Sequence, residues 1–189
     1  MKSAKLHNFN VEVFILAGGL SSRMGRDKAK LRLGRRTMLG HIRRPAKELG
    51  LPVRILRKDV ISRCGPLGGI YTGLIKSRAD AVLFLACDMP FVSAGLLEEI
   101  IESLGASRKA VFSRYGDLAG FPLLLRREAC LPVVEEQIEK KEFSLQSLAR
   151  VLKAKVLRPE RTRAEELENI NTPEELEKAR ERLRYADSK

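Results

Sequence analysis

Apolar residues gather in short runs along this chain, and polar residues separate the runs. Two six-residue segments, 11–16 and 81–86, are almost wholly apolar and rich in aliphatic side chains, which predicts buried strands. Shorter segments with the same character predict further strands at 53–56, 109–113, 121–125 and 155–157. A loop at 115–117 is expected to join two of these strands.

Between the strands, apolar positions recur every three or four residues, which is the spacing of a helix with one buried face. This pattern predicts helices at 37–49, 94–104, 127–138 and 144–152. Pro45 predicts a kink or an early end in the first of them, and Ser93 is a predicted N-cap. The segment 65–69 is expected to be a turn that leads into a helix through Ile75.

The last predicted helix begins at a clear capping signal. Thr172, Pro173 and Glu175 have the order of an N-cap, a first-turn proline and a capping glutamate. The helix is predicted to run to about Tyr185. Strands that alternate with helices in this way predict an α/β fold, a three-layer Rossmann-like architecture whose mostly parallel sheet has helices on both faces. We expect one domain over residues 1–189, with 1–10 as a flexible N-terminal segment.

Composition narrows the class of protein. No apolar run reaches 18 residues, and the N-terminus lacks the apolar stretch of a signal peptide, so we expect a cytoplasmic protein without a membrane span. The three cysteines, Cys64, Cys87 and Cys130, are odd in number and lack metal-ligand spacing. We expect them to be reduced thiols.

The positive charge of the chain is concentrated at one end. The net charge is +12, and residues 1–64 hold 16 Lys and Arg against 4 Asp and Glu, so the whole excess lies there. Such a field attracts polyanions, namely nucleic acid, anionic lipid or phosphorylated small molecules; a solvated basic surface is the less favoured alternative. Only Phe9 and Phe14 are aromatic in this basic third, which argues against an RNA-binding surface.

A glycine-rich loop follows the first strand, from Leu16 to Lys28. Gly18 and Gly19 let backbone N–H groups approach an anionic ligand closely, and Arg23, Arg26 and Lys28 offset triphosphate charge. The loop matches neither the P-loop nor the GxGxxG dinucleotide pattern.

Asp88 ends the strand at 81–86, where a carboxylate is desolvated unless it is paired or bound to a metal. Mg²⁺ prefers one or two carboxylates together with substrate phosphates, so Asp88 is the candidate metal ligand; capping of the next turn is the alternative. Ligands of parallel sheets bind at the carboxyl ends of strands, so Asp88 and the glycine-rich loop are predicted to meet.

Two further segments are candidates for binding. Gly65 and Gly68 let a base or ribose lie against the backbone, and Asp59 is a possible acceptor for guanine N1–H and N2–H₂. A simple turn and a surface charge are the respective alternatives. Asn169 and Asn171 point the same way if their segment is extended; helix capping is the alternative for Asn171.

Taken in order, these motifs resemble the molybdenum cofactor guanylyltransferase family (molybdopterin-guanine dinucleotide biosynthesis protein A), over roughly residues 11–180. The resemblance is carried by Leu16–Gly19, Arg23–Lys28, Gly65–Gly69, Cys87–Pro90 and Asn169–Leu176. It implies a nucleotidyltransferase fold and transfer of GMP from GTP to the phosphate of molybdopterin. It also implies Mg²⁺ on Asp88, molybdopterin beside Asn169 and Asn171, and transient contact with proteins of cofactor biosynthesis or molybdoenzyme delivery.

The expected site residues fall into two sets. Arg23, Lys28 and Asp88 are the expected catalytic residues. The expected nucleotide-binding residues lie in the three motifs already described: Leu16, Ala17, Gly18, Gly19, Lys28, Asp59, Gly65, Gly68 and Asp88.

Two departures from the family pattern affect the prediction of which nucleotide base the site selects. The family has an Asn-rich turn after the second strand, and residues 53–58 contain no Asn. The stretch before Gly65 is also shorter than usual. A related transferase that uses CTP or a sugar phosphate, and a nucleotide-binding regulator without turnover, are therefore the alternatives.

Overall fold

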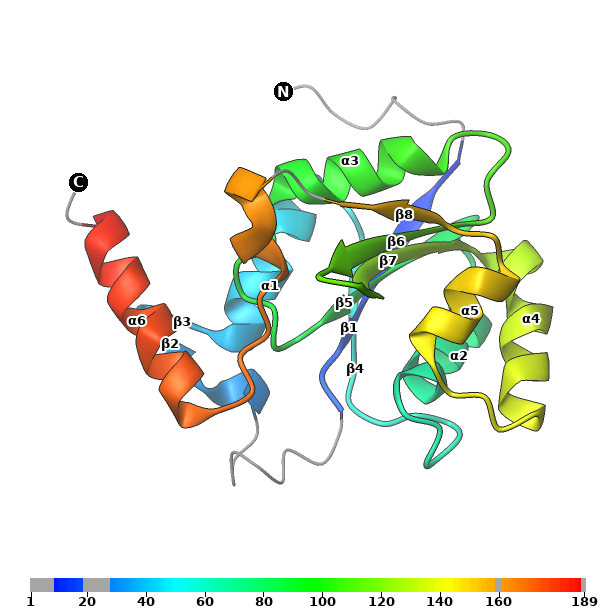
Figure 1. Ribbon diagram of the computed structural model, residues 1–189, viewed down its shortest axis with the longest axis horizontal. Helices are drawn as coiled ribbons and strands as arrows, with labels where there is room; N and C mark the ends of the chain where they lie inside the picture. Colours follow the sequence, from blue (N-terminus) through cyan, green and yellow to red (C-terminus); the bar gives the residue numbers. More distant parts are fainter. Residues whose placement is uncertain (1–8, 19–27, 159–160, 188–189) are drawn as a thin grey trace.

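Six strands form one sheet, in the order β4-β1-β5-β7-β6-β8 (Figure 1). The structure is a computed structural model that describes residues 9–18, 28–158 and 161–187. The strands of the sheet are β1 (Val11–Leu16), β4 (Val53–Leu56), β5 (Ala81–Ala86), β6 (Ala110–Tyr115), β7 (Leu118–Arg126) and β8 (Lys155–Leu157). All run in one direction except β7, which is antiparallel to both of its neighbours. The prediction of a mostly parallel α/β sheet is therefore confirmed.

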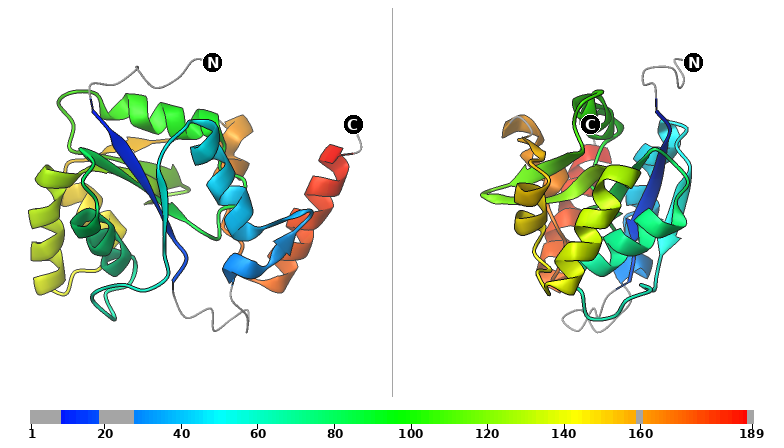
Figure 2. Two further views of the ribbon diagram at one scale, coloured as in Figure 1. Left: turned by 180° about the vertical axis from the view of Figure 1, so that it is seen from behind. Right: turned by 90° about the vertical axis from the view of Figure 1, so that its right-hand side faces the viewer.

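Helices cover both faces of this sheet, as the three-layer prediction requires (Figure 2). Helices α1 (Met38–Glu48) and α3 (Ala94–Leu104) pack on one face, in a core that includes Ile15 and Leu83. Helices α2 (Pro66–Lys76), α4 (Arg127–Glu139) and α5 (Leu145–Val151) pack on the other, around Phe14 and Phe84. Both faces of β1 and β5 are thus buried, which explains why these strands read as continuous apolar runs.

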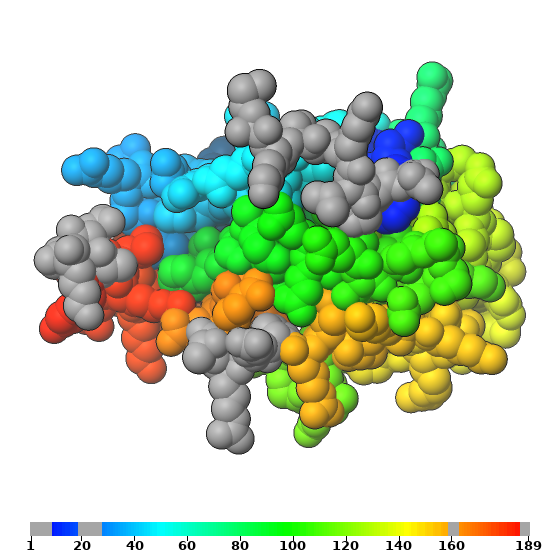
Figure 3. Space-filling model, turned by 90° about the horizontal axis from the view of Figure 1, so that it is seen from above, coloured from blue at the N-terminus to red at the C-terminus, as the bar shows by residue number. Residues whose placement is uncertain are grey.

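A smaller unit lies beside the sheet. Strands β2 (Arg32–Leu33) and β3 (Arg36–Thr37) form a hairpin, and α6 (Pro173–Asp187) packs against it through a third apolar cluster that contains Leu33 and Leu176. Seen from above, α6 (red) and the β2–β3 hairpin (blue) lie at one end of the molecule, and α4 (yellow-green) lies at the other (Figure 3). Two short 3-10 helices, η1 (Lys28–Lys30) and η2 (Arg161–Leu167), precede the hairpin and α6 respectively.

The predicted caps Ser93 and Thr172 operate as expected, and Thr37, which was expected to be the first residue of its helix, is instead its N-cap. Thr37 and Ser93 each accept a hydrogen bond from a backbone N–H in the first turn of their helix, at 3.0 and 3.1 Å. Thr172 Oγ1 accepts from the Glu175 N–H at 3.2 Å, and the Glu175 carboxylate accepts from the Thr172 N–H at 3.1 Å. This reciprocal pair is a capping box.

Two local predictions differ from the structure. Of the two outcomes expected at Pro45, the early end is wrong, because Ile42 and Ala46 bury the apolar face of α1 against the sheet and the helix continues to Glu48. The segment 65–69 is not a turn either. Helix α2 begins at Pro66, so Gly68 and Gly69 are helical residues; only Gly65, with φ of +53°, has the backbone conformation that favours glycine.

None of the helices described is long and apolar enough to cross a membrane.

Candidate active site

The carboxyl ends of three parallel strands meet at one edge of the sheet. Leu16 of β1 is paired with Leu56 of β4 and with Ala86 of β5, so the residues that follow each strand emerge side by side. Backbone hydrogen bonds extend this pairing, from Ala17 N–H to the Leu56 carbonyl at 2.8 Å and from Cys87 N–H to the Leu16 carbonyl at 3.1 Å. The antiparallel strand β7 begins at this same edge.

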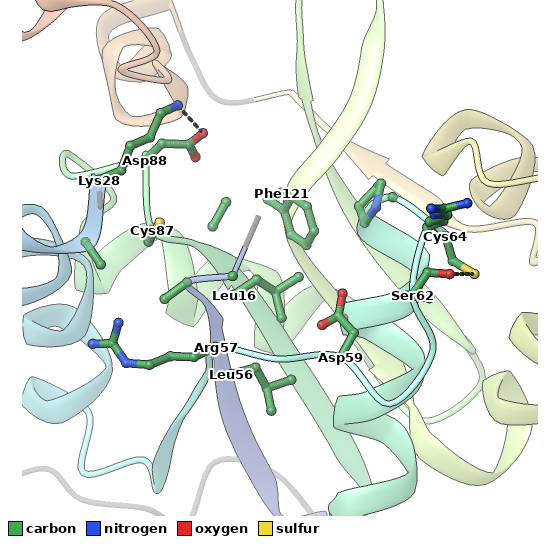
Figure 4. A pocket seen from close by; sticks show the side chains of 18 residues that line it. Leu16, Lys28, Leu56, Arg57, Asp59, Ser62, Cys64, Cys87, Asp88 and Phe121 are labelled. Atoms are coloured by element: carbon green, nitrogen blue, oxygen red, sulfur yellow. Dashed lines mark hydrogen bonds and ion pairs between the residues drawn. The ribbon is translucent and has the colours of Figure 1, made fainter. Parts of the chain in front are cut away.

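A pocket of about 900 Å³ opens at this edge (Figure 4). Its walls come from η1, from the residues after β1, β4 and β5, from the start of α2, and from β7. The lining residues are Leu16, Ala17, Gly18, Lys28, Ala29, Leu56, Arg57, Asp59, Ser62, Arg63, Cys64, Gly65, Pro66, Gly69, Ala86, Cys87, Asp88 and Phe121. The volume suits a small-molecule ligand.

Lys28 and Asp88 lie together at one end of the pocket. The Lys28 ammonium is 3.8 Å from the Asp88 carboxylate and donates a 2.7 Å hydrogen bond to Asn171 Oδ1. These three residues are 60 and 83 positions apart along the chain and come from η1, the end of β5 and the segment before α6. The predicted meeting of Lys28 and Asp88 is therefore confirmed.

Burial sets the electrostatics of Asp88. Loss of hydration raises the pKa of its carboxyl group, and the positive charge of Lys28 opposes that rise without cancelling it. Asp88 Oδ1 is buried, and among the described residues it has no hydrogen-bond partner. An unpaired buried carboxylate oxygen is costly, and a divalent cation is a ligand that removes the cost. The residue therefore fits a Mg²⁺ site.

The second carboxylate of the pocket is Asp59, which sits opposite Asp88. Figure 4 shows its side chain pointing into the pocket from the segment that follows β4. Partial burial raises the pKa of this carboxyl group as well. The prediction of Asp59 as a pocket residue is confirmed in position.

The predicted glycines have different environments. Gly18 lines the pocket, and a Cβ there would lie 2.7 Å from the Arg57 carbonyl oxygen, so any side chain would push the two strand ends apart. Gly65 and Gly69 also line the pocket. Gly68 is not among the lining residues: it lies under Asp59 and Ile61, where a Cβ would approach the Ile61 carbonyl to 3.0 Å. The absence of a side chain at Gly68 lets the segment that contains Asp59 and Ile61 pack closely on α2.

The two asparagines before α6 are also placed differently. Asn171 reaches Lys28, whereas Asn169 is exposed; neither is among the residues that line the pocket. Ile170 between them is buried, and its N–H donates to the Asp88 carbonyl at 2.8 Å. Gly19, Arg23 and Arg26 lie outside the described residues.

Phe121 is a pocket residue that the sequence reasoning missed. It enters because β7 is antiparallel, so that its early residues reach the carboxyl edge of β5. Strand order and direction, which no local pattern encodes, decide this. Arg57 and Cys87 were likewise given no role, although Cys87 is adjacent to Asp88 and Arg57 lies two residues before Asp59.

Comparison with known proteins agrees with this arrangement. The model of the MobA-like NTP transferase domain matches residues 13–59 and 43–159. A probable molybdenum cofactor guanylyltransferase of Carboxydothermus hydrogenoformans is 32% identical, over 89% of this chain and 94% of that protein. The molybdenum cofactor guanylyltransferase of Rhodobacter capsulatus is 31% identical, over 90% of this chain and 95% of that protein.

Solved structures share the fold. Molybdopterin-guanine dinucleotide biosynthesis protein A from Archaeoglobus fulgidus aligns with a TM-score of 0.70 at 22% identity, covering 92% of this chain and 99% of that one. The 2-C-methyl-D-erythritol 4-phosphate cytidylyltransferase from Thermus thermophilus aligns with a TM-score of 0.71 at 18% identity, covering 93% and 99%. At such identities these two likenesses describe the fold alone. From the family model and the curated relatives together, the chain belongs to the MobA-like NTP transferase family and is a nucleotidyltransferase related to the molybdenum cofactor guanylyltransferases.

Proposed function

We propose that this enzyme transfers GMP from GTP to the phosphate of molybdopterin, forming the guanine dinucleotide cofactor and pyrophosphate. The observation that carries the proposal is the meeting of Lys28 and Asp88 in one pocket beside the glycine-lined end of β1. The names of the relatives supply the substrates: a guanylyl donor and a molybdenum cofactor acceptor.

In the proposed reaction, an oxygen of the molybdopterin phosphate attacks the α-phosphorus of GTP. One P–O bond forms there, the bond between the α-phosphorus and the bridging oxygen breaks, and pyrophosphate leaves with that oxygen. The attacking phosphate is already ionised, so the protein contributes positioning and charge neutralisation rather than proton transfer. Lys28, with Arg23 from the same loop, is proposed to offset the charge that builds on pyrophosphate.

Asp88 would hold Mg²⁺ through its buried carboxylate oxygen, which has no hydrogen-bond partner among the described residues. A bound Mg²⁺ offsets phosphate charge and fixes the orientation of the triphosphate. Burial raises the pKa of Asp88 and so disfavours its charged form when no cation is bound. We propose that metal binding is the reason for this unfavourable placement.

At the other end of the pocket, Asp59 is proposed to accept hydrogen bonds from guanine N1–H and N2–H₂. Leu16, Ala17, Gly18 and Gly65 would lie against the nucleotide, and Gly19 belongs to the same proposed set. Gly68 would contribute indirectly, by letting the Asp59 segment approach α2 closely. Asn171, with Asn169 beyond it, marks the proposed molybdopterin side.

We further propose that the enzyme works in the cytoplasm and makes transient contact with proteins that prepare or receive the cofactor. The odd number of cysteines and their lack of metal-ligand spacing favour reduced thiols, as expected in a reducing compartment.

The test is pyrophosphate release with GTP, CTP, ATP and UTP, each with and without molybdopterin. We expect release with GTP alone among the four, and only when molybdopterin and Mg²⁺ are present. Release with CTP, or with a sugar phosphate as acceptor, would replace the proposed substrates. GTP binding without any release would identify a regulator instead.

A further inference from the structure

The ammonium of Lys28 is held by a residue of the C-terminal segment. An ammonium group has three N–H donors, and one of them is taken by Asn171 Oδ1 at 2.7 Å. The Lys28 side chain is only 17% exposed, so this bond is shielded from water. The same ammonium lies 3.8 Å from the Asp88 carboxylate, and Lys28 lines the pocket. The position of the Asn171 amide therefore sets the direction of the Lys28 charge.

The backbone of Asn171 is held from two sides. Its N–H donates to the Glu175 carboxylate at 2.5 Å, and the preceding residue, Ile170, is buried and bonded to the Asp88 carbonyl at 2.8 Å. The same Glu175 oxygen also accepts from the Thr172 N–H at 3.1 Å. A capping box needs only the Thr172 contact. The shorter bond to Asn171 lies one residue beyond what helix capping requires.

We propose that Glu175 is a positioning residue of the transfer reaction: it fixes the Asn171 backbone so that the Asn171 amide holds the Lys28 ammonium beside Asp88. This inference rests on the proposed function. Among the described residues, Glu175 has no hydrogen bond to Lys28 or Asp88, and its side chain is exposed. Its contacts reach the site through Asn171. Its negative charge also acts directly on Asp88, where it adds slightly to the rise in pKa that burial causes, so contact and charge have to be separated by experiment.

Two variants separate positioning from charge. Glu175→Gln removes the negative charge but keeps an amide oxygen that accepts from the Asn171 and Thr172 N–H groups. Glu175→Ala removes the acceptor altogether. Glu181→Ala is the matched control, because Glu181 is an exposed glutamate on the same helix α6, farther from Asn171.

The experiment is a double-mutant cycle with Asn171→Ala, read as kcat and KM for GTP well below the Tm of every variant. We expect Glu175→Ala to lower kcat/KM about tenfold, within the range for residues in one hydrogen-bond network. Glu175→Gln is expected to restore most of that loss, and Glu181→Ala to match wild type. In the Asn171→Ala background, Glu175→Ala is expected to have no further effect.

Independent losses that add in the double variant would overturn the proposal. So would wild-type kinetics for Glu175→Ala, or equal losses for the Ala and Gln variants. A second measurement, the affinity for a fluorescent GTP analogue without molybdopterin, separates failure of the positioning role from failure of the proposed transfer reaction. If wild type releases no pyrophosphate but Glu175→Ala still weakens analogue binding through Asn171, the positioning role stands and the transfer reaction does not.

Discussion

Asp88 combines two requirements that oppose each other at the scale of a single residue. The site needs an ionised carboxylate, yet burial favours the protonated form and leaves Oδ1 without a partner among the described residues. Lys28, 3.8 Å away, supplies part of the compensation. An arrangement of this kind lowers stability in the absence of a ligand and is expected at sites that bind one.

Asp88→Asn is therefore expected to abolish turnover while raising the stability of the metal-free protein. A raised pKa means that the folded state binds the proton more tightly than the unfolded chain. Wild-type stability then falls as pH rises from about 3.9, the ordinary pKa of aspartate, through the raised value. Asparagine is neutral throughout, so the advantage in Tm should appear across that window and persist at neutral pH.

Thermal unfolding in a chelator at several pH values measures this difference. Equal Tm values for wild type and Asp88→Asn at every pH would contradict the account of Asp88 burial. Near-normal Mg²⁺-dependent turnover of Asp88→Ala would remove the residue from the proposed metal site.

Lys28→Ala is expected to weaken GTP binding or slow transfer by about 1.5–3 kcal/mol, the contribution of a hydrogen bond to a charged group. The control is Lys30→Ala, which removes the same charge from the same short helix at an exposed position. Binding affinity and kcat for the two variants decide the point. Unchanged kinetics for Lys28→Ala, or equal losses for both, would argue against a specific role.

At the scale of elements, the close contact of α2 with the sheet depends on glycine. A Cβ on Gly73 would lie 2.4 Å from Phe84 Cε1, whereas a Cβ on Gly95, in the first turn of α3, would have no neighbour nearer than 3.8 Å. Both residues are helical, so intrinsic propensity treats them alike. Packing alone distinguishes them.

We expect Gly73→Ala to destabilise the protein by about 1–3 kcal/mol, the usual cost of overpacking. Gly95→Ala is expected to be neutral or stabilising by up to about 1 kcal/mol, because alanine favours helix over glycine. Chemical denaturation of both variants makes the comparison. A stabilising Gly73→Ala would show that α2 can move away from Phe84 at little cost.

Elements with local signals were predictable from the sequence, whereas those decided by packing were not. Strands β1 and β5 and the caps of α3 and α6 were predicted from residues within a few positions of one another. Pro45 and Gly68 misled the prediction because a local rule treated each as a helix breaker, and burial of the helix face outweighed that rule. The hairpin β2–β3 was missed because strands of two residues carry no periodic pattern.

At the scale of the whole molecule, the asymmetric charge is expected to guide anionic substrates. Hairpin β2–β3 and α1 carry exposed arginines around a second, basic groove that includes Arg36 and Arg43. Because salt screens such fields over about 10 Å at 0.1 M, kcat/KM for GTP should fall as ionic strength rises, with kcat little changed.

The double variant Arg36→Glu/Arg43→Glu should lower kcat/KM at low salt and flatten its salt dependence. Lys76→Glu/Arg78→Glu makes the same change in charge before β5, at the edge of the sheet opposite the pocket, and should have a smaller effect. Identical salt profiles for the two variants would mean that net charge, rather than its placement, matters.

By itself the sequence determined the fold class, the main strands, the helix caps and the two motifs that meet at Lys28 and Asp88. Those features depend on contiguous apolar runs, on local hydrogen bonding and on the rule that parallel strands end at one edge. Tertiary structure alone decided that Phe121 lines the pocket, that Gly68 packs under Asp59, and that Asn171 rather than Asn169 reaches Lys28. These depend on strand direction and on contacts between distant segments, which no local pattern of residues encodes.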